Sequence, residues 1–206
     1  MHCKIIVCLF VTTSFVIAQD NQPVLIDNSR SPDGRMELWI KSSSNQGEAI
    51  GTAQIRMVKT GKIAGTFKWS GFGYKAGHDA FTVLWRPDSK CFAISWEESK
   101  GWMTGSVYAF SENKRWVEVK FPTEQYGKAI KKLSGASALR GKGCDTPEKW
   151  LPNDQLVVNF ADEGILYDDV DAFKEYEVTL RVYDEKNTPL QVARIISIRL
   201  KPRDSQ

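Results

Sequence analysis

The stretch that decides the fold is SPDGRMELWI, residues 31–40. Pro32 sets the φ angle for a turn, the Asp33 side chain can bond to its own backbone, and Gly34 tolerates the left-handed conformation. Every second side chain from Met36 to Ile40 is then apolar, which is the pattern of a half-buried strand. The stretch therefore predicts a turn that leads into a β-strand.

The same order of turn and strand recurs twice along the chain. Residues 86–90 (RPDSK) repeat it closely, and residues 150–155 (WLPNDQ) repeat it more weakly. A hairpin follows each of the three strands. An internal repeat of this length predicts four-stranded units stacked side by side. The boundaries we expect are about residues 28–70, 80–121 and 149–202.

Residues 122–148 interrupt the repeat. A short helix is predicted to open at Pro122 and Thr123, with Tyr126, Ile130 and Leu133 on one face. A loop rich in glycine, serine and lysine is expected to complete this insertion. A single small β unit beyond the loop could not bury its own apolar face, so residues 19–206 are expected to form one β-rich domain.

The two Pro-Asp turns, each followed by a strand and a hairpin, resemble the TolB-type, WD-like β-propeller repeat. The hairpin turn at residues 59–62 (KTGK) resembles the Thr-Gly turn of that family. The resemblance implies a mainly β fold of antiparallel, blade-like hairpin sheets, and a role in scaffolding or recognition without a catalytic domain. Propellers close with about four to eight blades. Three units therefore favour an open, propeller-like stack, and a β-sandwich or an oligomer that completes a ring are the alternatives.

The first residues predict export. Lys4 precedes an apolar run, residues 5–17, that is too short to span a bilayer, and Val16 and Ala18 fit a signal-peptidase site. We expect residues 1–18 to be a cleaved signal peptide, with an uncleaved membrane anchor as the alternative. No later segment is apolar enough to cross a membrane, so a soluble secreted or periplasmic protein is expected. The chain has no Asn-X-Ser/Thr sequon, which favours a bacterial source.

Two cysteines, Cys91 and Cys144, remain after cleavage. In an oxidising compartment such a leftover pair predicts a disulfide. The alternative is that Cys91 is a small buried residue of its strand.

The residues carry little catalytic chemistry. His78 is the one histidine after cleavage, and no Gly-X-Ser-X-Gly elbow presents a nucleophile. The carboxylate pairs at 97–98 and 162–163 would point to opposite faces of a strand, and the acidic cluster at 168–171 lacks the glycine and distal glutamate of a calcium loop. No metal or cofactor is expected, and a small hydrolase is the last of the functional alternatives.

Aromatic residues near strand ends are the candidate binding residues: Trp69, Phe72, Tyr74 and Trp102. Exposed aromatic clusters mark interfaces and can stack on sugar rings. The expected function is a non-catalytic module that binds a protein partner, with a carbohydrate-binding module as the alternative. The small net charge of +3 gives no reason to expect nucleic acid as a partner.

Overall fold

The computed structural model describes residues 22–45, 48–72, 81–99, 102–134, 143–163, 173–184, 186 and 188–201. The predicted signal peptide, residues 1–18, lies outside the described residues. No helix within the described part of the chain is long and apolar enough to cross a membrane.

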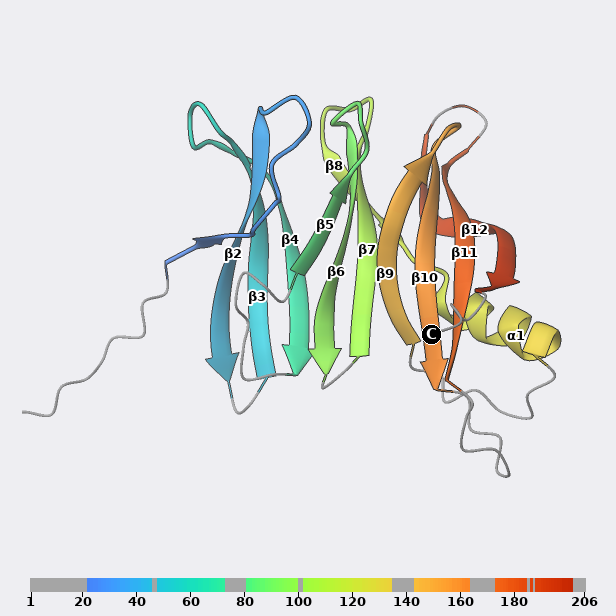
Figure 1. The fold of residues 1–206 in the computed structure, drawn as a ribbon. Helices are drawn as coiled ribbons and strands as arrows, with labels where there is room; N and C mark the ends of the chain where they lie inside the picture. Colours follow the sequence, from blue (N-terminus) through green and yellow to red (C-terminus); the bar gives the residue numbers. More distant parts are fainter. Residues whose placement is uncertain are drawn as a thin grey trace, which may run out of the picture.

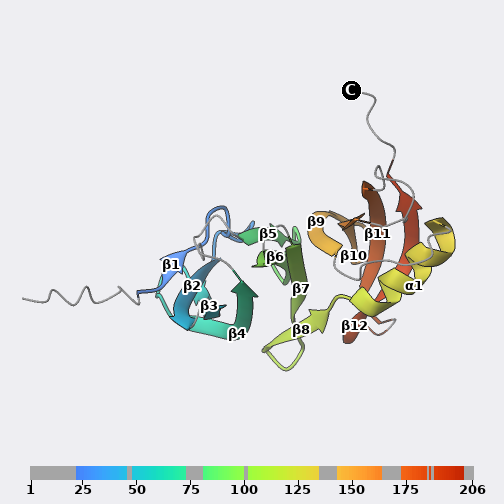
Figure 2. The ribbon, with the colours of Figure 1, turned by 90° about the horizontal axis from the view of Figure 1, so that it is seen from below.

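The fold is mainly β, as predicted, and consists of three antiparallel four-stranded meanders (Figure 1). The first sheet contains β1 (Val24–Leu25), β2 (Met36–Asn45), β3 (Glu48–Met57) and β4 (Ile63–Phe72). The second contains β5 (Phe81–Trp85), β6 (Cys91–Ser99), β7 (Trp102–Phe110) and β8 (Trp116–Lys120). The third contains β9 (Gly143–Leu151), β10 (Gln155–Glu163), β11 (Phe173–Tyr183) and β12 (Pro189–Leu200). Seen end-on, the three sheets lie side by side (Figure 2).

The second and third sheets are also joined along one edge. A single parallel pair, Val192 with Lys120, connects β12 to β8, so eight strands follow one another in the order β5-β6-β7-β8-β12-β11-β10-β9. At the other edge β9 packs against β5, β6 and β7, which nearly closes these strands into a barrel. The stack therefore consists of an open first sheet beside the second and third sheets, which together nearly form a barrel.

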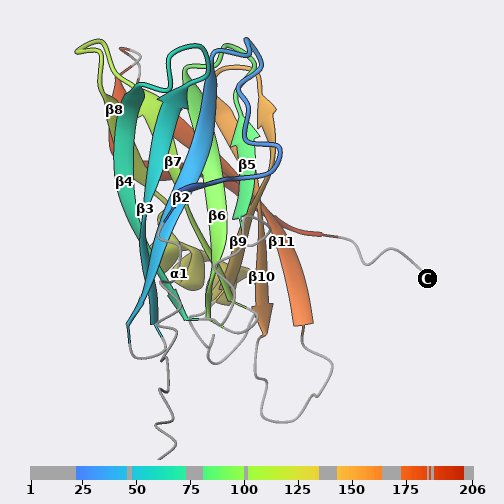
Figure 3. The ribbon, with the colours of Figure 1, turned by 90° about the vertical axis from the view of Figure 1, so that its left-hand side faces the viewer.

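The middle sheet is buried on both faces. Along β6, Phe92, Ile94 and Trp96 point toward the first sheet, while Cys91 and Ala93 point toward the third. This alternation follows from the two-residue period of a strand. Figure 3, viewed from the side of the first sheet, shows β2–β4 in front of β6 and β7.

The core between the first and second sheets is aromatic. Phe92 contacts the rings of Phe67, Trp85, Tyr108 and Trp116, with centroid distances of 4.7–6.3 Å. The Trp69 indole lies over Gly51 of the neighbouring strand and needs a glycine there, because a Cβ atom on Gly51 would lie 2.4 Å from the indole.

The core between the second and third sheets is mostly aliphatic. It joins Val107 and Val119 of the second sheet to Leu156, Val158 and Leu180 of the third. The helix α1 (Thr123–Ser134) lies at the lower end of this core in Figure 1 and places Ile130 in it.

Two features of the predicted insertion, residues 122–148, differ in the structure. The helix begins where the sequence predicts, but Leu133 is 60% exposed, so it is not part of the buried face with Ile130. The predicted loop ends earlier than expected, because β9 already begins at Gly143. This strand completes the third sheet.

A repeated hydrogen bond links successive sheets. The Trp85 indole Nε1 donates to the Ser29 carbonyl at 2.7 Å, and the Trp150 Nε1 donates to the Leu84 carbonyl at 3.0 Å. Each tryptophan stands two residues before the turn proline of its own sheet. Each accepting carbonyl belongs to the residue three positions before the turn proline of the preceding sheet. The third turn is one residue shorter between equivalent strand pairs, Trp85 with Phe92 and Trp150 with Leu156. A shift of one residue along a strand turns its side chains to the opposite face. The shorter turn therefore lets Leu156 face the middle sheet, as Phe92 faces the first sheet.

Candidate functional site

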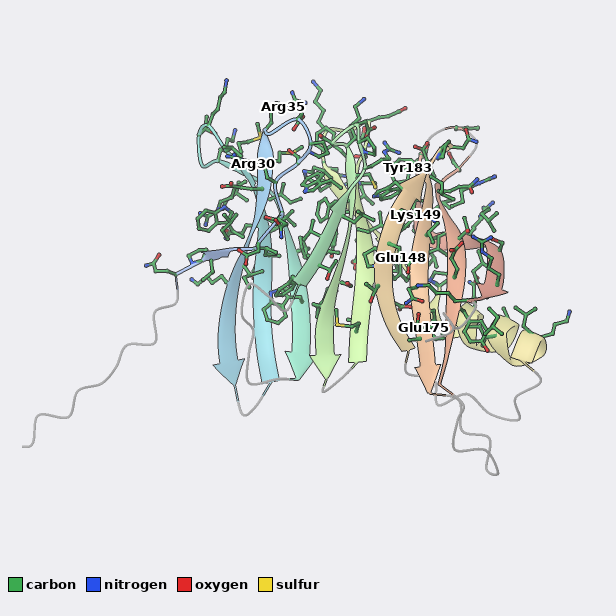
Figure 4. All side chains as sticks on the ribbon, viewed as in Figure 1. Arg30, Arg35, Glu148, Lys149, Glu175 and Tyr183 are labelled. Carbon is green, nitrogen blue, oxygen red and sulfur yellow. The ribbon has the colours of Figure 1, made fainter. Side chains whose placement is uncertain are left out.

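The turns that precede β2, β6 and β10 and the turns between β3 and β4, β7 and β8, and β11 and β12 lie at one end of the stack, at the top of Figure 1. We call this surface the turn end. It comprises residues 30–35, 58–62, 86–90, 111–115, 152–154 and 184–188, of which 185 and 187 lie outside the described residues. Figure 4 shows Arg30 and Arg35 at the turn end of the first sheet and Tyr183 near that of the third.

The first two Pro-Asp turns are bonded to each other. The Asp33 amide donates to the Ser89 hydroxyl at 3.1 Å, although the two residues are 56 positions apart. Within the first turn the Ser31 hydroxyl donates to Asp33 Oδ1 at 2.7 Å. Gly34 has a φ angle of 70°, the left-handed conformation that the sequence predicts for it. The turns of neighbouring sheets therefore hold one another in place.

Arg86 connects the second turn to the third sheet. Its guanidinium donates to Asp88 Oδ2 at 2.6 Å and also forms an ion pair with Asp154. It lies 4.9 Å above the Tyr183 ring, within the range of a cation–π contact. One half-buried arginine thus holds three chain segments together.

The turn aspartates are used within the protein. Burial alone would raise the pKa of Asp33, but hydrogen bonds from Ser31 and Arg35, with the charge of Arg35, lower it to about 2. Burial likewise works against the lowered pKa of Asp88, and the hydrogen bond from Arg86 outweighs it. Both carboxylates remain ionised near neutral pH and serve as internal acceptors, so they offer little charge to a ligand.

The turn end of the first two sheets carries an excess of positive charge. Residues 30–35, 58–62, 86–90 and 111–115 contain eight basic and three acidic residues. Seven of the basic residues are exposed: Arg30, Arg35, Lys59, Lys62, Lys90, Lys114 and Arg115. Among the described residues, Arg35 is the one of these seven that has an ion pair, with Asp33. The turn end therefore carries six exposed cations that form no ion pair with a described carboxylate, and it can attract an acidic surface.

The structure places one predicted binding residue in the core. Trp69 is only 5% exposed and packs edge-to-face against Phe81 at 5.1 Å between the first two sheets. Its nearness to a strand end suggested exposure, but the second sheet covers it. Trp69 is therefore not available to a ligand, and this part of the prediction is wrong.

The other predicted residues are not brought together by the described part of the structure. Phe72 ends β4 and Trp102 begins β7, so both lie at the end of the sheets opposite the turn end. Their side chains are not among the described parts of the structure. Tyr74 and His78 lie outside the described residues altogether. The described residues contain no group of three histidine, cysteine, aspartate or glutamate side chains that could hold a metal ion.

The predicted disulfide between Cys91 and Cys144 is not formed. Cys91 is a buried free cysteine, and burial raises the pKa of its thiol to about 12. Cys91 lies at the turn end of β6, because its carbonyl accepts a hydrogen bond from the Arg86 amide. Arg86 forms an ion pair with Asp154 at the same end. Cys144 stands near the opposite end of β9, seven residues before Leu151, which is about 23 Å along a strand. A disulfide requires Cα atoms within about 7 Å.

Sequence reasoning missed the turn end as a basic surface. The turn lysines and arginines lie in four separate segments and look like ordinary solvated turns. The signal that could have found them is the repeat itself, since four-stranded meanders of the same direction place all these turns at one end.

No family model, curated protein or solved structure matches the chain.

Proposed function

We propose that the mature chain is an exported, non-catalytic binding module that recognises an acidic surface of a protein partner through its turn end. The observation that carries the proposal is the set of six exposed cations, none in an ion pair with a described carboxylate, on the turns of the first two sheets, whose Pro-Asp turns are bonded to each other. The positive charge of this surface steers an acidic partner toward it.

The resemblance to the TolB-type, WD-like β-propeller repeat belongs to the same proposal. Stacked four-stranded sheets with Pro-Asp turns at one end support it, as does the repeated indole-to-carbonyl bond between sheets. A recognition role is what that resemblance implies. Export, inferred from residues 1–18, would place the partner in the cell envelope or outside the cell.

Charge reversal at the turn end should weaken partner binding. We expect the fourfold variant Lys59→Glu, Lys62→Glu, Lys114→Glu and Arg115→Glu to bind the partner at least about tenfold more weakly, mainly through slower association. The partner would first be identified with a photo-crosslinking residue at position 114 of the full chain in its native host. Binding of the purified pair would then be measured by surface plasmon resonance at several salt concentrations.

The matched control reverses four exposed lysines elsewhere: Lys41, Lys68, Lys128 and Lys132. This control changes the net charge by the same amount, so it should keep affinity within about twofold if the location of the charge matters. A second chain with the photo-crosslinking residue at position 128 serves as the control for the cross-linking. Equal losses of affinity in both variants, or cross-links from position 128 and none from position 114, would show that the turn end is not the binding surface.

A further inference from the structure

The outer face of the first sheet is not covered by another sheet in the described structure. The register places Glu37 beside Arg56, and Trp39 between Leu25 and Gln54. Thr52, Thr66 and Lys68 continue this face across β3 and β4. We call these residues, together with Lys41, the platform.

The platform occupies the positions of core residues in the next sheet. The bond from the Ser31 amide to the Met36 carbonyl corresponds to the bond from the Arg86 amide to the Cys91 carbonyl, both 2.8 Å long. This correspondence aligns Glu37 with Phe92 and Trp39 with Ile94. The end of a stack requires a polar outer face, but such a face does not require a tryptophan.

The side chains of the platform are already held in position. The Trp39 indole donates to Glu37 Oε1 at 2.8 Å, and Arg56 donates twice to Gln54 Oε1, at 2.6 and 2.9 Å. The Arg56 guanidinium carbon lies 4.6 Å from the centre of the Trp39 ring. The described hydrogen bonds of Arg56 therefore go to a neutral amide, and its guanidinium forms no ion pair with a described carboxylate.

The outer face of the third sheet is the other terminal face of the stack, and its charged residues can be compared with those of the platform. There Lys201 pairs with Glu148 at 2.7 Å and with Glu175 at 3.6 Å, and Arg199 pairs with Glu177. Figure 4 shows Glu148 and Glu175 on this sheet. These cations are matched by carboxylates, whereas Arg56, Lys41 and Lys68 have no ion pair among the described residues. The first sheet combines its unpaired cations with a tryptophan, whereas no aromatic side chain is described on the outer face of the third sheet.

We propose that the platform binds an acidic polysaccharide. The Arg56 guanidinium, held over the Trp39 indole, offers a planar surface on which a sugar ring can stack, and the three cations can pair with carboxylates along the polysaccharide. Gln54, Thr52 and Thr66 supply amide and hydroxyl groups for sugar hydroxyls. A single-stranded nucleic acid would stack successive bases on several aromatic rings, and Trp39 is the one aromatic side chain described on this face.

The proposal concerns a surface distinct from the turn end and does not rest on the proposed function. The probe is a set of galacturonate oligomers, titrated calorimetrically into the full mature chain. We expect the Arg56→Gln/Lys68→Gln variant to bind at least about tenfold more weakly, the sum of two modest charge interactions. Trp39→Leu should cost about fivefold through the lost stacking surface.

Matched controls separate this site from general charge effects. The Lys149→Gln/Arg194→Gln variant removes two exposed cations from the third sheet and should bind as the wild type does. The Lys114→Glu/Arg115→Glu variant should also bind normally, which keeps this test separate from that of the turn end. Circular dichroism would confirm that each variant is folded.

Three results would overturn the proposal. One is no binding of galacturonate oligomers, and another is equal binding of neutral dextran. The third is equally tight binding of single-stranded poly(dT) that Trp39→Leu leaves unchanged, because this result would identify a general attraction for polyanions.

Discussion

Replacing Phe92 by alanine lowers the free energy of unfolding by about 3–5 kcal/mol, the usual cost of truncating a buried phenylalanine. Phe92 is fully buried and contacts four aromatic rings, one from the first sheet and three from its own. The cavity would open at the centre of the first core, where rigid strands cannot collapse to fill it. Urea denaturation followed by tryptophan fluorescence and circular dichroism measures this loss.

Phe110→Ala is the matched control for this truncation. Phe110 is 38% exposed and contacts one ring, that of Trp116. We expect it to cost about 1 kcal/mol, in proportion to its smaller buried area. If the two variants lost equal stability, the first core would not be the centre of packing that the structure describes.

Asp145→Asn stabilises the protein increasingly as the pH rises. Asp145 is 2% exposed on the inner face of β9, its Oδ1 has no hydrogen-bond partner, and burial raises its pKa to about 8. The unfolded chain loses this proton near pH 4, whereas the folded chain holds it to about pH 8. The stabilising contribution is therefore complete below pH 4 and is lost as the pH rises through 8.

The expected slope between pH 4 and pH 8 is at most about 1.4 kcal/mol per pH unit, because one proton is released on unfolding. Asparagine cannot titrate, so its denaturation curves should diverge from those of the wild type over this window. Glu112→Gln changes an exposed carboxylate and serves as the control. Parallel pH profiles for Asp145→Asn and the wild type would show that Asp145 is ionised in the folded state.

Much of the fold could be predicted because its signals are local. The turns at Pro32 and Pro87 are specified by consecutive residues. The alternation of apolar and polar side chains in the strand after each turn is specified in the same way. The helix start at Thr123 follows from Pro122 in the same way. Each of these features depends on a few neighbours, and the structure contains all of them.

The third sheet was harder to predict because its signals conflict. β9 begins with glycine and contains Asp145 and Pro147, residue types that are depleted in strands. Only the neighbouring strand β10 and the cover of the second sheet make this segment a strand. The shorter turn at Asn153 and Asp154 also changes which side chains face inward, and the two positive φ angles there become visible only in the structure.

The candidate site depends on which faces meet, and one sequence does not contain that information. Trp69 and Trp39 both stand in strands of the first sheet, yet Trp69 is buried and Trp39 is partly exposed. The sequence suggested a binding role for Trp69 and none for Trp39. Their roles follow from the second sheet, which covers one face of the first sheet and leaves the other open.

The central claim of this account is that the middle sheet is buried on both faces and holds the other two sheets in place. Hydrogen–deuterium exchange of the mature chain, read by mass spectrometry, tests it most directly. We predict that the amides of β6 and β7 exchange last, at the rate of global unfolding, and that those of β4 and β12 exchange earlier. Exchange in β6 and β7 that is faster than in the first sheet would contradict the claim.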